Sequence, residues 1–180
     1  MKKLIAATLA LFMLATLASA QMAGGKKPAS PPASTQCKFS DGKSIKIDYS
    51  SPRAKGRKIF GTGDALVPYG EVWRTGANDA TTFVATANVN VGGKDVPAGN
   101  YTIFTVPNAD KWMLIINKKT GEWGIPYKYE SDELGRVPMM VSKTSGPVEN
   151  FTIAFDQAGS KCTLRMEWEN TRASVEISEK

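Results

Sequence analysis

The sequence contains no histidine among its 180 residues. Histidine is the usual base of nucleophilic triads and the commonest metal ligand, so its absence excludes Ser-His-Asp catalysis, Cys-His catalysis and His-ligated metal sites. The two cysteines are too few for a four-cysteine zinc site. Beyond the first twenty residues, no apolar run is long enough to span a bilayer. No nucleic-acid-binding motif occurs either, so we expect no nucleic acid partner.

The first twenty residues have the features of a secretory signal peptide. Lys2 and Lys3 precede an apolar run from Leu4 to Leu17, and Ala18-Ser19-Ala20 is a small-residue cleavage site. The apolar run is shorter than the roughly 20 residues that a membrane-spanning helix needs, so we expect cleavage before Gln21 rather than a membrane anchor. The sequence therefore predicts a bacterial, exported protein that is periplasmic or extracellular.

The rest of the chain divides into a tether and one domain. The segment from Gln21 to Gln36 is rich in Gly, Pro, Ala and Ser, which predicts a flexible tether, and the folded domain is expected over residues 37–180. Cys37 and Cys162 lie near the two ends of that domain, and an even pair of cysteines in an oxidising compartment favours a disulfide. Two buried thiols are the alternative.

Hydrophobic residues in the domain recur mainly with a period of two. Ile45, Ile47 and Tyr49 alternate with polar residues, and Gly92-Gly93 is typical of a tight hairpin. Eight or nine short strands follow one another between turn clusters, and no segment shows a helical period. This pattern predicts an all-β fold, a single antiparallel β-sandwich, with a barrel as the alternative.

Two adjacent segments, Ser50–Tyr69 and Gly70–Ala80, do not fit the strand pattern. We call residues 50–80 the connection. Apolar and aromatic residues are interspersed among its charged residues, which argues that it is ordered. Long ordered connections on a rigid sandwich are frequent places for binding sites, so the connection is the expected location of a site.

The connection is also where the sequence resembles a known family. Its run Val72–Asn78 (VWRTGAN) is the most specific part of a likeness to the bacterial exported family called domain of unknown function 2911. The other runs that carry the resemblance are Ser51–Arg53, Lys55–Gly61, Leu66–Gly70, Pro97–Tyr101, Phe104–Pro107, Asn117, Trp123–Gly124, Phe151–Ile153 and Trp168–Arg172. The resemblance covers about residues 37–178. It implies a secreted, β-rich protein and assigns no activity.

Enzyme and metal motifs are weak. Ser40–Lys43 and Lys119–Gly121 match the S-x-x-K and K-T-G of penicillin-binding proteins, but both are better interpreted as hairpin turns because no S-D-N occurs. Short acidic patches occur at Asn78-Asp79 and Asp132-Glu133, and neither matches a calcium loop, so no metal and no cofactor is predicted. A His-free hydrolase would need paired carboxylates, and the candidates are Asp64, Glu71 and Asp79.

The arginine and aromatic side chains of the connection support a more specific hypothesis, a site for a polar or anionic ligand. Arginine forks bind carboxylates and phosphates through two hydrogen bonds, and aromatic faces offer platforms for sugar rings or peptide side chains. The predicted ligand-binding residues, with Trp73 as the platform, are Arg53, Arg57, Tyr69, Trp73, Arg74, Asn78 and Asp79. Trp123 offers a further flat face, and Arg172 belongs to the site or to the scaffold. In the alternative interpretation, Arg74 pairs with Glu71 or Asp79 and Trp73 lies in the core.

These observations favour a non-enzymatic binding or interaction module. Its expected partner is an anionic glycan, a peptide or another component of the cell envelope, which suits the modest excess of basic side chains. A small His-free hydrolase is one alternative. A structural scaffold that presents its sheet edges to a partner protein is the other.

Overall fold

The computed structural model describes residues 29–180, and almost all of the regular structure there is β. The predicted signal peptide and residues 21–28 of the predicted tether lie outside this range. The strands are β1 (Pro32–Lys38), β2 (Ser44–Ser50), β3 (Phe60–Gly61), β4 (Val67–Pro68), β5 (Thr81–Ala85), β6 (Val89–Val91), β7 (Lys94–Val96), β8 (Gly99–Val106), β9 (Lys111–Asn117), β10 (Glu133–Ala158) and β11 (Lys161–Glu179). One short 3₁₀ turn, Glu130–Asp132, precedes β10. The part of the chain described here has no helix long and apolar enough to cross a membrane.

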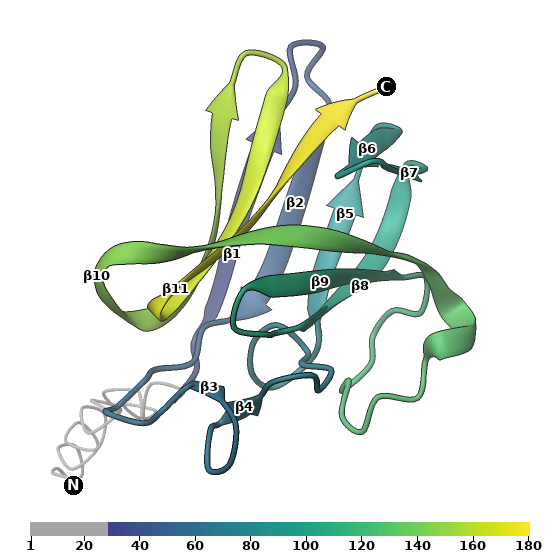
Figure 1. Ribbon diagram of the computed structural model, residues 1–180. Helices are drawn as coiled ribbons and strands as arrows, with labels where there is room; N and C mark the ends of the chain where they lie inside the picture. Colours follow the sequence, from purple (N-terminus) through teal and green to yellow (C-terminus); the bar gives the residue numbers. More distant parts are fainter. Residues whose placement is uncertain (1–28) are drawn as a thin grey trace, which may run out of the picture.

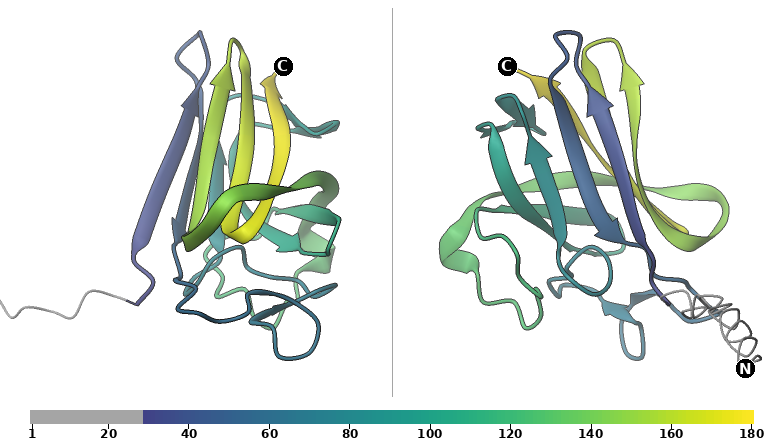
Figure 2. Two further views of the ribbon diagram at one scale, coloured as in Figure 1. Left: turned by 60° about the vertical axis from the view of Figure 1, so that its left-hand side comes forward. Right: turned by 180° about the vertical axis from the view of Figure 1, so that it is seen from behind.

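Nine of the strands form one antiparallel sheet in the order β1-β2-β5-β8-β9-β10-β11-β6-β7. The sheet curls back on itself, so that β1, β2, β5 and β8 stand behind the β10–β11 hairpin in Figure 1, and the views in Figure 2 show the same two layers. The two ends of this sheet do not close into a barrel. The all-β sandwich predicted from the sequence is therefore confirmed.

The alternating pattern in the sequence corresponds to an alternation in burial. Ile45 and Ile47 in β2 and Phe83 and Ala85 in β5 are buried, while Lys46 between the first two is exposed. Antiparallel pairing of β2 with β5 places Ile47 opposite Phe83, so their side chains enter the core together. The apolar residues that recur with a period of two therefore form the inner face of the sandwich.

The predicted disulfide is present. Cys37 and Cys162 are bonded, with their Cα atoms 6.3 Å apart and a sequence separation of 125. The bond joins β1 to β11 and so links the two layers. The sequence pattern placed Cys162 in the penultimate strand, whereas β11 is the last, because Lys161–Glu179 is one continuous strand rather than two.

Strand β10 is also longer than its sequence predicts. Residues Thr144–Pro147 read as a turn, yet they lie inside the 26-residue strand β10. Its pairing with β11 shifts register on both sides of Val148, which marks bulges at the point where the strand bends. The first half of β10 therefore pairs with β9 and the second half with β11.

Strand β1 extends into the segment predicted as a tether. Residues 32–36 of the predicted tether belong to β1, which pairs with β2 along its whole length from Pro32 opposite Ser50 to Lys38 opposite Ser44. Among the residues of β1, Cys37 alone is buried. The segment is therefore ordered by the hydrogen-bond ladder to β2 rather than by apolar burial, and composition alone does not reveal such a strand.

Candidate functional site

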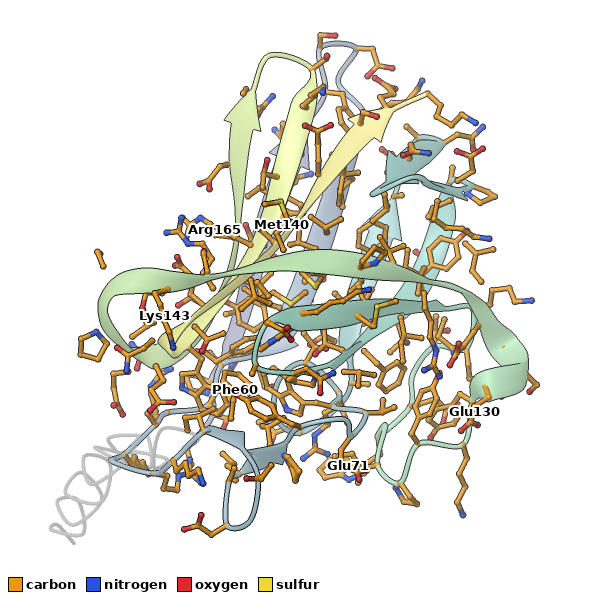
Figure 3. All side chains as sticks on the ribbon, in the orientation of Figure 1. Phe60, Glu71, Glu130, Met140, Lys143 and Arg165 are labelled. Carbon is orange, nitrogen blue, oxygen red and sulfur yellow. A yellow bond between two sulfur atoms is a disulfide. The ribbon has the colours of Figure 1, made fainter. Side chains whose placement is uncertain are left out.

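The connection links β2 to β5 and covers the end of the sandwich that lies opposite the C-terminus in Figure 1. Two-residue strands β3 and β4 pair in parallel within it. Figure 3 shows Phe60 on the inner side of the connection and Glu71 at its outer rim. Phe60 is buried and Glu71 is exposed, so one layer of irregular chain both closes the core and forms a surface.

Trp73 is not the open platform that the sequence predicts. It is 7% exposed, and its ring stacks on Trp168 with 5.8 Å between the ring centroids. Its backbone pairs with Thr105 through two hydrogen bonds of 2.7 and 2.9 Å, and its indole Nε1 donates to the Gly76 carbonyl at 3.1 Å. Trp73 therefore anchors the connection to the core. Tyr69 is half-buried and packs against the same core.

Arg53 and Arg57 hold the first part of the connection by hydrogen bonds to oxygens of the connection itself. Arg53 Nη1 donates to the Ser51 carbonyl at 3.0 Å and to Ser51 Oγ at 2.8 Å. Arg57 donates from Nε to the Ala54 carbonyl at 3.1 Å and from Nη2 to the Arg53 carbonyl at 2.6 Å. Among residues 29–180, neither guanidinium forms a salt bridge. Their positive charges therefore have no acidic partner within the described fold.

Arg74 lies over an aromatic ring instead of pairing with an acid. Its Cζ is 4.7 Å from the centroid of Trp123, and Nη1 donates to the Trp123 carbonyl at 3.4 Å. Burial lowers the pKa of the Arg74 guanidinium, and the charge of Asp79 opposes that shift. The buried Nε of Arg74 has no hydrogen-bond partner among the described residues. The pairing of Arg74 with Glu71 or Asp79, expected in the alternative interpretation, does not occur as a salt bridge in residues 29–180.

Trp123 supplies the exposed aromatic face that Trp73 does not. It is 55% exposed, whereas the other three tryptophans of the sequence, Trp73, Trp112 and Trp168, are buried. Trp123 lies in residues 118–129, which we call the Trp123 loop. The Ala80 amide donates to the Glu122 carbonyl at 3.1 Å, so the end of the connection is attached to this loop.

The Trp123 loop is held close to the sheet by polar and steric contacts. Buried Asn117 donates from Nδ2 to the Tyr129 carbonyl at 2.7 Å and to the Tyr127 hydroxyl at 3.2 Å. The Tyr127 hydroxyl donates to Glu133 at 2.7 Å, and burial together with this bond raises the pKa of Tyr127. At Gly124, a Cβ atom would lie 3.0 Å from Ala80 and 3.1 Å from Arg74, so only glycine allows this close approach.

The remaining predicted residues, Asn78 and Asp79, are both exposed. Asn78 has a left-handed backbone with φ of 59°, and its Nδ2 donates to the Ser30 carbonyl at 3.3 Å and to Ser50 Oγ at 3.2 Å. Asp79 acts on Arg74 through its charge. The seven predicted residues therefore do not converge on one cleft: Arg53 and Arg57 lie near the bend of β10, Arg74 lies at the Trp123 loop, and Trp73 and Tyr69 lie inward.

The three carboxylates proposed for a hydrolase lie on the surface. The Asp64 side chain is 89% exposed and lies 3.3 Å from Lys58 Nζ, and Glu71 and Asp79 are exposed as well. A catalytic carboxylic acid usually sits in an apolar enclosure, which these positions do not provide. Within residues 29–180, no group of three or more Asp, Glu or Cys side chains is placed to hold a metal ion. Arg172 donates from Nε to buried Glu167 at 2.6 Å, so it belongs to the scaffold.

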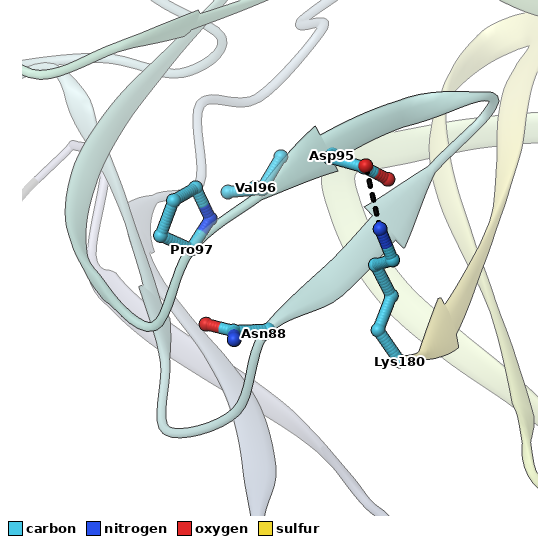
Figure 4. A pocket seen from close by; sticks show the side chains of 5 residues that line it. All are labelled: Asn88, Asp95, Val96, Pro97 and Lys180. Atoms are coloured by element: carbon cyan, nitrogen blue, oxygen red, sulfur yellow. Dashed lines mark hydrogen bonds and ion pairs between the residues drawn. The ribbon is translucent and has the colours of Figure 1, made fainter.

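Within residues 29–180, two of the surface hollows lie away from the Arg74–Trp123 contact. One, of about 200 Å³, is lined by Asn88, Asp95, Val96, Pro97 and Lys180, and is partly spanned by a Lys180–Asp95 ion pair of 2.6 Å (Figure 4). The other, of about 340 Å³, lies between Arg57 and the bend of β10 and β11. It contains Glu149, Glu169 and Asn170, which we did not predict. No local signal marks these three residues, because the fold brings them to Arg57 from far along the chain.

Residues 30–177 match the family described as "Protein of unknown function (DUF2911)". The match spans most of the sequence and nearly all of the part that the structure describes. The chain matches no curated protein and no solved structure.

Proposed function

The chain belongs to this family of unknown function, and we propose that it is a non-enzymatic binding module for a polar or anionic ligand of the cell envelope. The Arg74–Trp123 pair is the observation that carries the proposal. The binding surface consists of Arg74 and the exposed part of Trp123, with Asp79 close enough to act on Arg74 through its charge. The ligand class that suits it best is an acidic sugar, which presents both a ring face and a carboxylate.

Arg74 has the properties of an anion-binding group. Its guanidinium is partly desolvated, lies over an indole, and has no salt bridge within the described residues. A carboxylate bound there would stabilise the charged form of Arg74, which burial disfavours. Because the planar fork also stacks on aromatic rings, arginine is better suited than lysine to such a position.

Trp123 has the properties of a sugar platform. More than half of its surface is exposed, and the loop beneath it is fixed by Asn117, Tyr127 and Glu133. A rigid aromatic side chain loses little conformational freedom on binding, so each contact contributes more to affinity. The exposed aromatic residue therefore serves as a preformed surface beside the cationic group.

Tryptophan fluorescence tests this proposal directly, because iodide quenching reports on Trp123 while the other three tryptophans are buried. A galacturonic acid oligomer should protect Trp123 from quenching, and the neutral galactose oligomer should do so more weakly. We expect Arg74→Gln to weaken the acidic oligomer at least tenfold, since it removes a charged hydrogen-bond donor. Trp123→Phe should weaken both oligomers, and calorimetry measures this loss because the variant removes the fluorescent reporter.

Arg172→Gln is the matched control, because Arg172 is bonded to Glu167 within the scaffold. It should leave protection unchanged. Added salt should weaken binding of the acidic oligomer, as expected for an exposed charge contact. If neither oligomer protects Trp123, or if Arg74→Gln and Arg172→Gln have the same effect, the Arg74–Trp123 surface is architectural and this function is wrong.

A further inference from the structure

The larger hollow lies where the connection meets the bend of β10 and β11. The Ala54 amide donates to the Glu149 carbonyl at 2.8 Å, and the Lys55 amide donates to Glu149 Oε1 at 2.9 Å. An isolated bridge between Arg53 and Asn150 continues this attachment. The hollow of about 340 Å³ is therefore framed by hydrogen bonds between two segments far apart in sequence, and its volume falls at the lower end of the roughly 300–1,000 Å³ found for small-molecule sites.

Opposite charges line this hollow without neutralising one another. Arg57 lies on one side, and Glu149 and Glu169 also line it. Within residues 29–180, neither glutamate forms a salt bridge with Arg57 or with any other basic side chain. Arg57 uses Nε and Nη2 for backbone carbonyls, and Nη1 forms no hydrogen bond within this part of the chain. A cationic donor and anionic acceptors thus line the same space.

The other lining residues suit a small amphiphilic molecule. Asn170 adds an amide that both donates and accepts, and Pro147 and Val148 add apolar surface. Glu169 has φ of 54°, in the left-handed region that favours glycine, and it pairs with Val148 where the strand register shifts. Strained backbone of this kind is concentrated at functional sites, and here it carries one of the two acidic groups of the hollow.

We propose that this hollow binds a small zwitterion, a free α-amino acid, through its two charged groups. Arg57 receives the carboxylate, Glu169 and Glu149 receive the ammonium group, and Asn170 orients the molecule between them. A ligand that carries both charges close together complements Arg57 and the two glutamates at once. A simple anion would bind Arg57 but would be repelled by the two glutamates. The inference is independent of the Arg74–Trp123 surface, because the two sites share no residue.

Amide chemical shifts of the purified protein, titrated with alanine, test the proposal. Alanine should saturate, with shifts confined to residues around Glu149, Glu169 and Arg57. Acetate carries the carboxylate alone and methylammonium the ammonium alone, so each should bind at least tenfold more weakly than alanine. If acetate or methylammonium binds as tightly as alanine, or if alanine causes no saturable shifts, the proposal is overturned.

Two substitutions separate binding from folding. Glu169→Gln should weaken alanine at least tenfold, whereas the matched change Glu176→Gln, at a glutamate paired with Lys161 elsewhere on β11, should have no effect. Glu169→Gly also removes the carboxylate, but it relieves the left-handed backbone, so the thermal midpoint should stay equal or rise while alanine binding is lost. Arg74→Gln should leave alanine binding intact. Retained alanine binding in both Glu169 variants would overturn the proposal.

Discussion

The strand pair β2–β5 and the connection that joins the two strands both pack against the core. Their backbones are held in different ways. Ile47 and Phe83 are fixed by a regular antiparallel ladder. The connection depends on individual bonds, such as that from the Trp73 indole to Gly76 and that from Thr81 Oγ1 to the Thr75 carbonyl at 2.7 Å. Irregular chain thus stays ordered here because buried side chains satisfy its backbone groups one by one.

The distribution of strained backbone shows the same difference. Four residues other than glycine have a positive φ within residues 29–180, namely Lys55, Thr75, Asn78 and Glu169. Three of them lie in the connection, and the fourth lines the hollow beside Arg57. The regular strands are nearly without such residues, so the strain gathers at the end of the molecule that carries both proposed sites.

Removing the disulfide should cause the largest loss of stability. The bond ties together the two strand layers and does not touch the connection. Replacing both cysteines, Cys37→Ala and Cys162→Ala, should lower the free energy of unfolding by about 4–5 kcal/mol, since the bond closes a loop of 125 residues. Denaturant unfolding followed by circular dichroism and by tryptophan fluorescence measures this loss.

The two probes should report one coincident transition, because Trp73 of the connection stacks on Trp168 of β11. The reduced wild-type protein should match the double variant. An earlier fluorescence transition, followed by separate loss of the sheet signal, would contradict the view that the connection and the strands form one cooperative unit.

Trp73 gives the next largest effect and tests the connection itself. Trp73→Ala should lower the free energy of unfolding by about 3–5 kcal/mol, since it empties a buried site that contacts Phe60, Phe151 and Trp168. Trp123→Ala is the matched control and should change it by about 0.5 kcal/mol or less, because most of Trp123 is exposed. Equal losses in the two variants, measured by denaturant unfolding, would show that burial does not distinguish the two tryptophans.

The strand region was largely predictable from the sequence, and the reason is geometric. A period of two in apolar residues is sufficient to locate β2 and β5, since only one face of each strand enters the core. The disulfide followed from the even number of cysteines and the oxidising compartment that the sequence predicts. The bulges near Val148 were not predictable, because the turn-like residues Thr144–Pro147 have the same composition in a bend within a strand as in a loop between two strands.

The candidate site was predicted less completely, because irregular chain has no period that separates inside from outside. The sequence marked the connection as a stretch without long strands and named both Trp73 and Trp123 as flat faces, but it chose as the platform Trp73, which is buried, whereas Trp123 is exposed. Whether Arg57 lies near Glu169 depends on how β10 bends, and no local pattern encodes that distance. The likeness to the family placed these runs in one domain without assigning a role to any of them.

A substitution at Gly76 should cause the smallest loss of stability. It tests whether the backbone shape of the connection, rather than its buried side chains, positions Arg74. A Cβ atom at Gly76 would lie 2.9 Å from the Ser50 carbonyl oxygen and 3.2 Å from Thr81 Oγ1, so Gly76→Ala should cost about 1–3 kcal/mol of unfolding free energy. Gly63→Ala is the control: Gly63 also has a positive φ, but a Cβ atom there would meet nothing within 4 Å, so its cost should stay near 1 kcal/mol. Because Gly76 lies between Arg74 and Asn78, its variant should also weaken binding of the galacturonic acid oligomer, while the Gly63 variant should not. Thermal unfolding and iodide quenching measure the two effects, and equal results for the two glycines would show that the turn at Gly76 does not position Arg74.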